Sequence, residues 1–411
     1  MKVLFCSPFL SYTGHIQRLA ALKAHGMTEA GLDVTVIGFP ASFNQLVPGE
    51  RLRYISLQDF VSENTRARLA RWGHRFGNIW LFIVETLWVQ LYSLRYAKRH
   101  GFQIVFISDI EPWTLLLALL LTGAPWRGPK IVGFASFIFD VHYIHPSMTW
   151  YSRCRVRLNS LCNRWLSYFI HIISDCDHGL SSWRVLPGKG HVIPDAYDRV
   201  ALPISRNESR TRLDLPQDER MILLFGVAST GKGAETLFTA MEDLPPDFHV
   251  CVVGRTGEEM LASWGGEYLL KRGWAVRLRI VSRYVSEAER HDYFSACDAV
   301  VLPYRKGMFG LSGNFRDAIS YQRALIVTDQ YTMGRIVRER QLGLTFRLDD
   351  AADLRRCLEE FAHMPDKWFE VIAGRCNALA EECRWENVGQ SYRELFEQLV
   401  QESNKHSSRG L

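Results

Sequence analysis

Two glycine-rich loops in the second half of the chain carry residues suited to binding phosphate. The first, residues 225–233, follows an apolar run, precedes a helical pattern and ends in Lys232-Gly233. A P-loop would need Ser or Thr directly after the lysine to ligate Mg²⁺, and Gly233 stands there instead. The loop therefore favours a site where the backbone approaches a diphosphate and Lys232 acts as a point charge. The alternative is a solvated lysine at a tight turn.

The second loop, residues 304–314, contains three glycines and opens another helical pattern. Its cations are Arg305 and Lys306. Exposed amides and the positive end of the helix dipole would form an anion site there, with Ser312 or Asn314 as the helix cap. Asp317, about one turn inside the helix, is placed either to accept hydrogen bonds from ribose hydroxyls or to compensate the dipole.

The elements that position these loops alternate between short β-branched runs and longer helical patterns, which is typical of parallel sheets with crossover helices. Strands are predicted at residues 3–6, 33–38, 103–108, 130–134, 169–174 and 191–194, then at 221–225, 249–253, 276–281, 299–302 and 325–328. Helices are predicted at 233–242, 286–296 and 314–322. The fold class is therefore α/β, with two doubly wound sheets, and ligands are expected beyond the carboxyl ends of the strands.

A polar, proline-containing stretch at residues 197–220 predicts a domain boundary. We expect a first domain at residues 1–200, a second at 201–384 and a terminal helix at 385–402, with a frayed tail after Glu402. The apolar run 113–124 is shorter than the roughly 20 residues that span a bilayer and is predicted to be a buried helix.

Composition narrows the class of protein. The chain has 411 residues, 47% hydrophobic and 23% charged, as in a folded globular protein. Residues 1–200 hold 21 Lys and Arg against 13 Asp and Glu, a net charge of +8, which favours an anionic partner for the first domain. The nine cysteines are scattered without a CxxC pair, so we expect free thiols and a cytoplasmic location.

Beyond these patterns, the second half resembles the retaining GT-B glycosyltransferases, family 4-like, also called glycosyl transferases group 1. The resemblance rests on Lys232-Gly233, on the ADV-type strand at 296–303, on Asp317-Ala318 and on the strand 326–329 that ends in Thr-Asp. It implies two Rossmann-like domains that face a cleft. It also implies that Lys232, Gly310, Leu311 and Ser312 bind the donor diphosphate and that Asp317 binds the ribose.

The chain departs from the family pattern at two positions of the donor site. Phe309 stands where the family has its sugar-contacting Glu, and Val227 replaces the family's arginine, with Arg305 or Lys306 as the expected substitutes. In the first half the resemblance covers a glycine loop at Gly14, assigned to the donor site, the segment 192–198 and the terminal helix.

Candidate residues for the sugar or the acceptor lie on a loop of the first domain. The family's histidine after strand 130–134 is replaced by Ala135-Ser136, so Asp140 and His142 are predicted instead, together with Lys232, as catalytic residues. The sequence Asp175-Cys176-Asp177 imitates a metal-binding DxD, but we interpret it as a loop end with a capping Asp and expect no metal.

Arginines at 68, 71 and 75 beside the apolar stripe 69–83 suit the surface of a membrane, although a helix with a core face and solvated arginines is the alternative. The expected function is transfer of a sugar from a nucleotide-diphosphate donor to a hydroxyl of a sugar, glycan or lipid-linked acceptor, with retention, without a cofactor and without nucleic acid. The enzyme would be cytoplasmic or peripheral at the inner face of the membrane. The alternatives are a P-loop nucleotide hydrolase and a non-catalytic scaffold that binds nucleotide sugars.

Overall fold

The computed structural model describes residues 1–7, 15–38, 49–57, 79–124, 128–135, 150–197, 205–226, 232–242, 244, 247–254, 273–306 and 311–409. The chain forms two compact units. The first consists of Met1–Asp195 together with Trp385–Leu411, and the second of Ala196–Arg384. The chain therefore leaves the first unit once and returns to it through the last helix.

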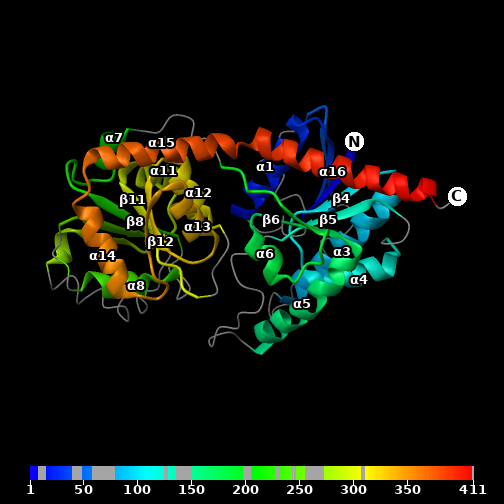
Figure 1. The fold of residues 1–411 in the computed structure, drawn as a ribbon, viewed down its shortest axis with the longest axis horizontal. Coiled ribbons are helices and arrows are strands. Elements are labelled where there is room, and N and C mark those ends of the chain that lie inside the picture. The colour runs from blue at the N-terminus through cyan, green and yellow to red at the C-terminus, as the bar shows by residue number, and fades with distance from the viewer. Residues whose placement is uncertain are drawn as a thin grey trace. The chain divides into compact units, whose positions relative to one another are not determined.

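The first unit is built on a seven-stranded parallel sheet (Figure 1). Its strands are β1 (Lys2–Cys6), β2 (Asp33–Gly38), β3 (Leu52–Ser56), β4 (Ile104–Ile107), β5 (Lys130–Phe134), β6 (His171–Ser174) and β7 (Gly190–Val192). Their order is β3-β2-β1-β4-β5-β6-β7, which is the doubly wound arrangement. The central strands β4 and β6 are buried along their whole length, as expected when helices cover both faces of a parallel sheet.

Helices cover the two faces of this sheet (Figure 1). They are α1 (His15–Glu29), α3 (Ile79–Arg99), α4 (Pro112–Thr122), α5 (Trp150–Phe169), α6 (Asp177–Ser182) and α16 (Trp385–Arg409). Helices α3, α4 and α5 pack side by side in that order, whereas α1 packs against α16. The first unit thus contains helices from both ends of the sequence.

Helix α16 crosses α1 at a pair of glycines. A Cβ atom on Gly389 would lie 2.0 Å from the carbonyl oxygen of Gly26, so only glycine permits this approach. Beyond the crossing, Tyr392 and Phe396 pack against Phe106 of β4, with ring centroids 5.4 and 6.0 Å away. The last helix therefore completes the core of the first unit.

The second unit repeats the architecture with a six-stranded parallel sheet in the order β10-β9-β8-β11-β12-β13. Its strands are β8 (Met221–Phe225), β9 (His249–Val253), β10 (Leu278–Val281), β11 (Ala299–Leu302), β12 (Ala324–Thr328) and β13 (Gly343–Phe346). Its helices are α7 (Arg206–Arg212), α8 (Ala234–Met241), the 3₁₀ turn η4 (Trp274–Val276), α11 (Glu287–Ala296), α12 (Gly313–Ser320), α13 (Tyr331–Arg340), α14 (Ala351–Ala362) and α15 (Asp366–Glu382). Helices α8 and α14 pack together on one face of the sheet, and α11 and α12 lie on the other (Figure 1).

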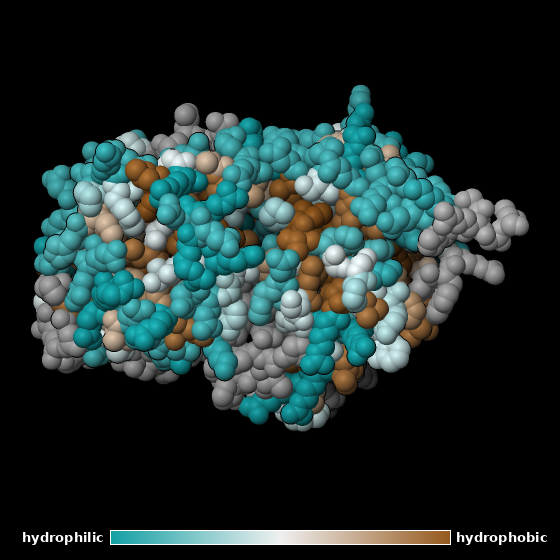
Figure 2. Space-filling model, viewed as in Figure 1, coloured by the Kyte–Doolittle hydropathy of each residue, from teal (hydrophilic) through white to brown (hydrophobic). Residues whose placement is uncertain are grey.

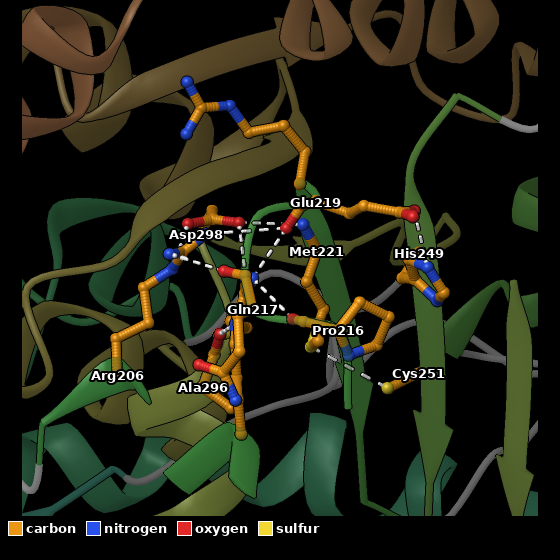
Figure 3. Close-up of polar contacts among 12 residues, drawn as sticks. Arg206, Pro216, Gln217, Glu219, Met221, His249, Cys251, Ala296 and Asp298 are labelled. Atoms are coloured by element: carbon orange, nitrogen blue, oxygen red, sulfur yellow. Dashed lines mark hydrogen bonds and ion pairs between the residues drawn. The ribbon is translucent and has the colours of Figure 1, made fainter. Parts of the chain in front are cut away.

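A buried polar cluster ties α7 to the amino ends of β8 and β11. The Arg210 side chain, which is fully buried, donates to the carbonyl oxygens of Pro216, Gln217, Glu219 and Ala296. It also pairs with Asp298 at 3.0 Å, and Asp298 accepts a hydrogen bond from the Met221 amide (Figure 3). Because Met221 begins β8 and Asp298 precedes β11, this cluster fixes the two strands relative to each other.

The predicted fold class, α/β with two doubly wound parallel sheets, is confirmed. Three local predictions differ from the structure. The sequence did not indicate the edge strands β3 and β13. The chain after Glu402 is helical to Arg409. The apolar run 113–124 does form a helix, α4, but Leu117, Leu120 and Leu121 are exposed. None of the helices in the described ranges is both long and apolar enough to cross a bilayer.

Candidate nucleotide-sugar site

The two glycine-rich loops meet where the strand order of the second sheet reverses. Strands β8 and β11 are neighbours, with Ile222 paired to Ala299 and Leu223 to Val300, although 73 residues separate their ends. From β8 the sheet continues to β9 on one side, and from β11 to β12 on the other. The loops after β8 and β11 therefore flank the crevice at which doubly wound sheets bind ligands.

Lys232 reaches back to the carboxyl end of β8. Its Nζ lies 2.7 Å from the point where a Cβ on Gly226 would stand, and the Asn314 Nδ2 lies 3.4 Å from that point. Burial lowers the pKa of the Lys232 ammonium. Within the ranges that the structure describes, no carboxylate pairs with this ammonium. A partly desolvated cation at the mouth of the crevice is thus left to pair with an anionic ligand.

Gly233, which follows the lysine, joins the two loops through their backbones. It has φ +70° and precedes α8 as its N-cap residue. A Cβ atom here would lie 1.7 Å from the carbonyl oxygen of Pro303, the residue after β11. The Lys-Gly pair is therefore a requirement of packing as well as of charge, because any side chain at residue 233 would push the loops apart.

The loop after β11 enters α12 through a capped turn. The Ser312 hydroxyl accepts a hydrogen bond from the Phe315 amide at 3.2 Å, so Ser312 and not Asn314 is the N-cap. Asn314 instead donates from Nδ2 to the carbonyl oxygen of Phe225, the last residue of β8. Leu311, directly before the cap, is buried. Tyr304, at the start of the same loop, is also buried, and this burial raises the pKa of its phenol to about 12. The start of α12 is thus fixed beside the end of β8.

Asp317 lies one turn into α12 and is held by an arginine of α11. The Asp317 Oδ2 and the Arg290 Nη1 are 2.7 Å apart, and Arg290 also contacts Glu287 at 3.2 Å. Both side chains of the Arg290–Asp317 pair are largely buried. The ion pair fixes the position of the Asp317 carboxylate, as an acceptor for ribose hydroxyls requires.

The two cations predicted to replace the family's arginine differ in their surroundings. Arg305 pairs with Glu235 of α8 at 2.9 Å and with Asp349 at 3.2 Å. Lys306 is exposed. Arg305 would have to leave two carboxylates to bind a phosphate, so the structure gives it a role in holding the loop after β11 against α8.

Several predicted residues lie outside the described ranges. They are Gly14, Asp140, His142 and Gly310. Val227 and Phe309, which depart from the family pattern, also lie outside them. The roles predicted for Gly14, Asp140, His142 and Gly310 stay predictions. Of the other predicted residues, the structure brings Lys232, Leu311, Ser312 and Asp317 to the loops around the switch point.

Polar groups also gather at the corresponding switch point of the first unit. Asp109 follows β4 and accepts a hydrogen bond from the Ser108 hydroxyl at 2.9 Å. Burial raises the pKa of the Asp109 carboxyl to about 6. Nearby, the Lys23 ammonium pairs with Asp195 at 3.1 Å and lies 3.2 Å from the centroid of the Phe134 ring. These groups stand at the carboxyl edge of the first sheet, where a doubly wound fold binds ligands.

The structure corrects the interpretation of the Asp-Cys-Asp sequence after β6. The capping group of α6 is the Cys176 thiol, which accepts a hydrogen bond from the Gly179 amide at 3.4 Å. Asp177 lies in the first turn of α6. The prediction of an Asp as the cap was therefore wrong. The segment is nevertheless the end of a loop, where helix α6 begins.

Three residues of the site were not assigned to it from the sequence. They are Gly226, Arg290 and Asn314, of which Asn314 was predicted only as a possible helix cap and not as a contact to the end of β8. Gly226 could have been found from its place directly after a buried strand. Arg290 carries no local signal, because its partner is 27 residues away on another helix.

The two doubly wound units define a fold class, GT-B. Sucrose-phosphate synthase from Thermosynechococcus elongatus matches with a TM-score of 0.69 and 17% identity over 97% of this chain and 98% of that chain. HepE from Anabaena, in complex with UDP-glucose, matches with a TM-score of 0.66 and 13% identity over 97% of this chain and all of that chain. These similarities confirm the fold.

A family comparison matches part of the second unit. Residues 205–372, less than half of the chain, match the family "Glycosyl transferases group 1". D-inositol 3-phosphate glycosyltransferase from Streptosporangium roseum is 27% identical over 214 residues, which are 48% of this chain and 47% of that protein. The chain thus spans about half the length of this curated relative. The resemblance to glycosyl transferases group 1 and to the GT-B fold is confirmed, whereas retention stays a prediction.

Proposed function

We propose that the protein is a glycosyltransferase that takes a sugar from a nucleotide-diphosphate donor bound to the second unit. The observation that carries the proposal is the Lys232 ammonium, which is partly desolvated and has no carboxylate partner in the described part of the second unit. It stands at the switch point beside the start of α12, whose amides and dipole favour an anion. A diphosphate supplies the missing negative charge.

The rest of the donor is assigned from the same loops. In this proposal Asp317 accepts hydrogen bonds from the ribose hydroxyls, and Arg290 keeps its carboxylate in place. Leu311 and Ser312 contribute backbone at the diphosphate. The similarity to HepE, whose structure contains UDP-glucose, supports a nucleoside diphosphate sugar as the donor.

We further propose transfer with retention and without a metal. The bond between the anomeric carbon and the diphosphate breaks as the acceptor oxygen bonds to that carbon on the same face. The acceptor proton passes to the departing phosphate oxygen, so the chain supplies no general base. Negative charge grows on the diphosphate during this step, and Lys232 stabilises it.

The first unit binds the acceptor in this proposal, which is a hydroxyl of a sugar, a glycan or a lipid-linked sugar. Its carboxyl edge carries Asp109, Lys23 and Asp195. Asp140 and His142, which lie outside the described residues, are proposed to contact the acceptor. The enzyme works in the cytoplasm, where nucleotide sugars are its source of activated carbohydrate.

The test is a thermal-shift panel of UDP-, GDP- and ADP-sugars, with and without EDTA, followed by product analysis with the donor that binds. Lys232→Met should lower kcat by about 100- to 1000-fold, the usual effect of losing one fixed electrostatic contact to a transition state. Lys306→Met, which removes an exposed lysine from the other loop, is the matched control and should retain most of the activity.

Asp317→Asn should weaken donor binding. If no nucleotide sugar stabilises the protein, the proposal is wrong. Release of phosphate from ATP or GTP that requires Mg²⁺ and no acceptor would assign the loop to a nucleotide hydrolase. Binding of a nucleotide sugar without transfer to any acceptor would assign the protein as a scaffold.

A further inference from the structure

One face of helix α5 exposes large apolar side chains to solvent. Leu158, Leu161, Trp165 and Tyr168 recur at helical spacing and share one side of the helix. Leu161 is 71% exposed and Trp165 is 63% exposed. Single exposed apolar residues are normal on a protein surface, but a continuous stripe of them marks an interaction site.

Helix α4, which packs beside α5, adds to the same apolar surface. Leu117, Leu120 and Leu121 lie on one side of α4 and are exposed, with Leu121 at 58%. Figure 2 shows hydrophobic side chains over the part of the first unit where Figure 1 labels α4 and α5. We call this surface the α4–α5 face and define it by Leu117, Leu120, Leu121, Leu158, Leu161, Trp165 and Tyr168.

The orientation of α5 is fixed by polar contacts on its other side. Arg155 donates to Glu111, the N-cap residue of α4, from Nε at 2.8 Å, and Asn159 donates to the same carboxylate at 3.0 Å. Asn163 and Ser167 are buried against the unit. The buried side of the helix therefore combines Leu166 with these polar groups, and the apolar stripe lies on the solvent side instead of in the core.

Positive charge borders the apolar stripe. Arg153, Arg157 and Arg164, at spacings of four and seven residues, share one side of α5 next to the stripe. Neither α4 nor α5 contains an Asp or a Glu. An apolar strip with aromatic residues, bordered by arginines and free of acidic residues on its own helices, complements the surface of an anionic bilayer.

From this we infer that the α4–α5 face docks the first unit on the surface of an anionic lipid bilayer. Trp165 and Tyr168 lie at the level of the headgroups, the leucines enter the boundary of the acyl chains, and the arginines contact lipid phosphates. The stripe 69–83 considered from the sequence lies largely outside the described residues, and Ile83 is buried. The α4–α5 face is defined by other residues.

This inference rests on the exposed face and not on the transferase activity. Together with the proposed function, it places the acceptor-binding unit at a membrane and favours a lipid-linked acceptor. The two proposals fail independently, because vesicle binding is measured without a donor and donor binding is measured without vesicles.

The experiment is flotation of the full chain with phosphatidylcholine vesicles, with and without phosphatidylglycerol. The wild type should float with the anionic vesicles, and added salt should weaken binding because the arginine contacts are screened. The double variant Leu161→Ser/Trp165→Ser should lose about tenfold or more in apparent affinity. Arg157→Gln/Arg164→Gln should lose affinity for the anionic vesicles.

The matched control is Tyr284→Ser, which removes an aromatic side chain that is 82% exposed in the second unit. It should bind vesicles as the wild type does. Leu120→Ser, a single change on α4, gives a second readout if the double variant is unstable, and the thermal shift with nucleotide sugar should be unchanged in every variant.

Two results would overturn the inference. One is that the wild-type protein stays at the bottom of the gradient with both kinds of vesicle, neutral and anionic. The other is a concentration-dependent dimer in analytical ultracentrifugation that Leu161→Ser/Trp165→Ser abolishes, because the face would then belong to a second copy of the chain.

Discussion

Replacing Arg210 by methionine tests whether the polar cluster at the amino ends of β8 and β11 holds together the strands that lead to the site. The variant removes four hydrogen bonds to carbonyl oxygens and the 3.0 Å pair with Asp298. Methionine has a similar length and fills most of the space, so the loss is polar and not steric.

The magnitude follows from what remains. Arg206 still donates to the carbonyl oxygens of Gln217 and Glu219, at 3.1 and 3.4 Å, so the carbonyls that lose the Arg210 donor without such a replacement are those of Pro216 and Ala296. They cost about 1 kcal/mol each, and loss of the charged hydrogen bond from Arg210 to Asp298 costs about 2 kcal/mol more. Asp298 keeps Arg206 at 3.0 Å and the Met221 amide at 2.8 Å, so it is not left as an uncompensated charge. Burial of the methionine side chain returns about 1 kcal/mol. We expect a net loss of about 3 kcal/mol, which lowers the melting temperature of a unit of this size by roughly 6 to 12 °C.

The assay is hydrogen exchange followed by mass spectrometry, because it reports on the amides of each unit separately. Amides of β8 and β11 should exchange faster in Arg210→Met by a factor that matches the lost free energy, whereas amides of β1 and β4 in the first unit should not change. Arg206→Met, at a side chain that is 30% exposed, is the control and should cost about 1 kcal/mol or less. If Arg210→Met leaves the exchange of β8 unchanged, the cluster does not fix these strands and the reasoning fails.

Two further predictions concern the loops and the first unit. Gly233→Ala should destabilise the second unit by about 2 kcal/mol or more and abolish the thermal shift with nucleotide sugar, because of the positive φ and the contact with Pro303. The control is Gly374→Ala on α15, where a Cβ would stand in open space, and it should not destabilise the protein. Equal losses of stability of the two variants in calorimetry would contradict this account. Asp109→Asn should change the pH dependence of stability. Because burial raises the folded-state pKa of Asp109 from 3.8 to about 6, its contribution to stability is full below the lower value and is lost as the pH rises through about 6. Urea titrations should show that the wild type loses free energy of unfolding relative to Asp109→Asn across this range, and parallel profiles would show that the carboxyl is not so perturbed.

The parts of the fold that could be predicted from the sequence are those with a continuous apolar signal. The bounds of β2, β5, β8, β9 and β11 agree with the predicted ones. Parallel strands covered on both faces are nearly continuous apolar runs, as in β8 and β11, and β2 is recognised by its β-branched Val34, Thr35, Val36 and Ile37. The edge strand β3 reads Leu-Arg-Tyr-Ile-Ser and is half-exposed, so it carries no such signal. For α4, hydrophobicity predicted the helix but not which side of it the neighbouring helices cover.

For the candidate site, too, the sequence predicted what a local signal marks and missed what tertiary contacts determine. Lys232 and Asp317 could be predicted as candidates because glycine spacing and helix starts are local in the sequence. The contacts that fix them are not local: Arg290 reaches Asp317 from another helix, and Asn314 bonds to the end of β8 instead of capping its own helix. The sequence predicted that Arg305 binds a phosphate, but in the structure this side chain pairs with Glu235 and Asp349.

The close crossing of α1 and α16 affects how the chain can fold during synthesis. The core around Phe106 stays open until Tyr392 and Phe396 pack against it, and these residues are synthesised after the whole second unit. The second unit, continuous from Ala196 to Arg384, can be complete before the first is closed. Domains usually fold in the order in which they are made, but here the first unit is completed by a helix that is made after the second unit. A nascent chain arrested before Trp385 should therefore expose the apolar side of α1 to chaperones while its C-terminal sheet is already folded.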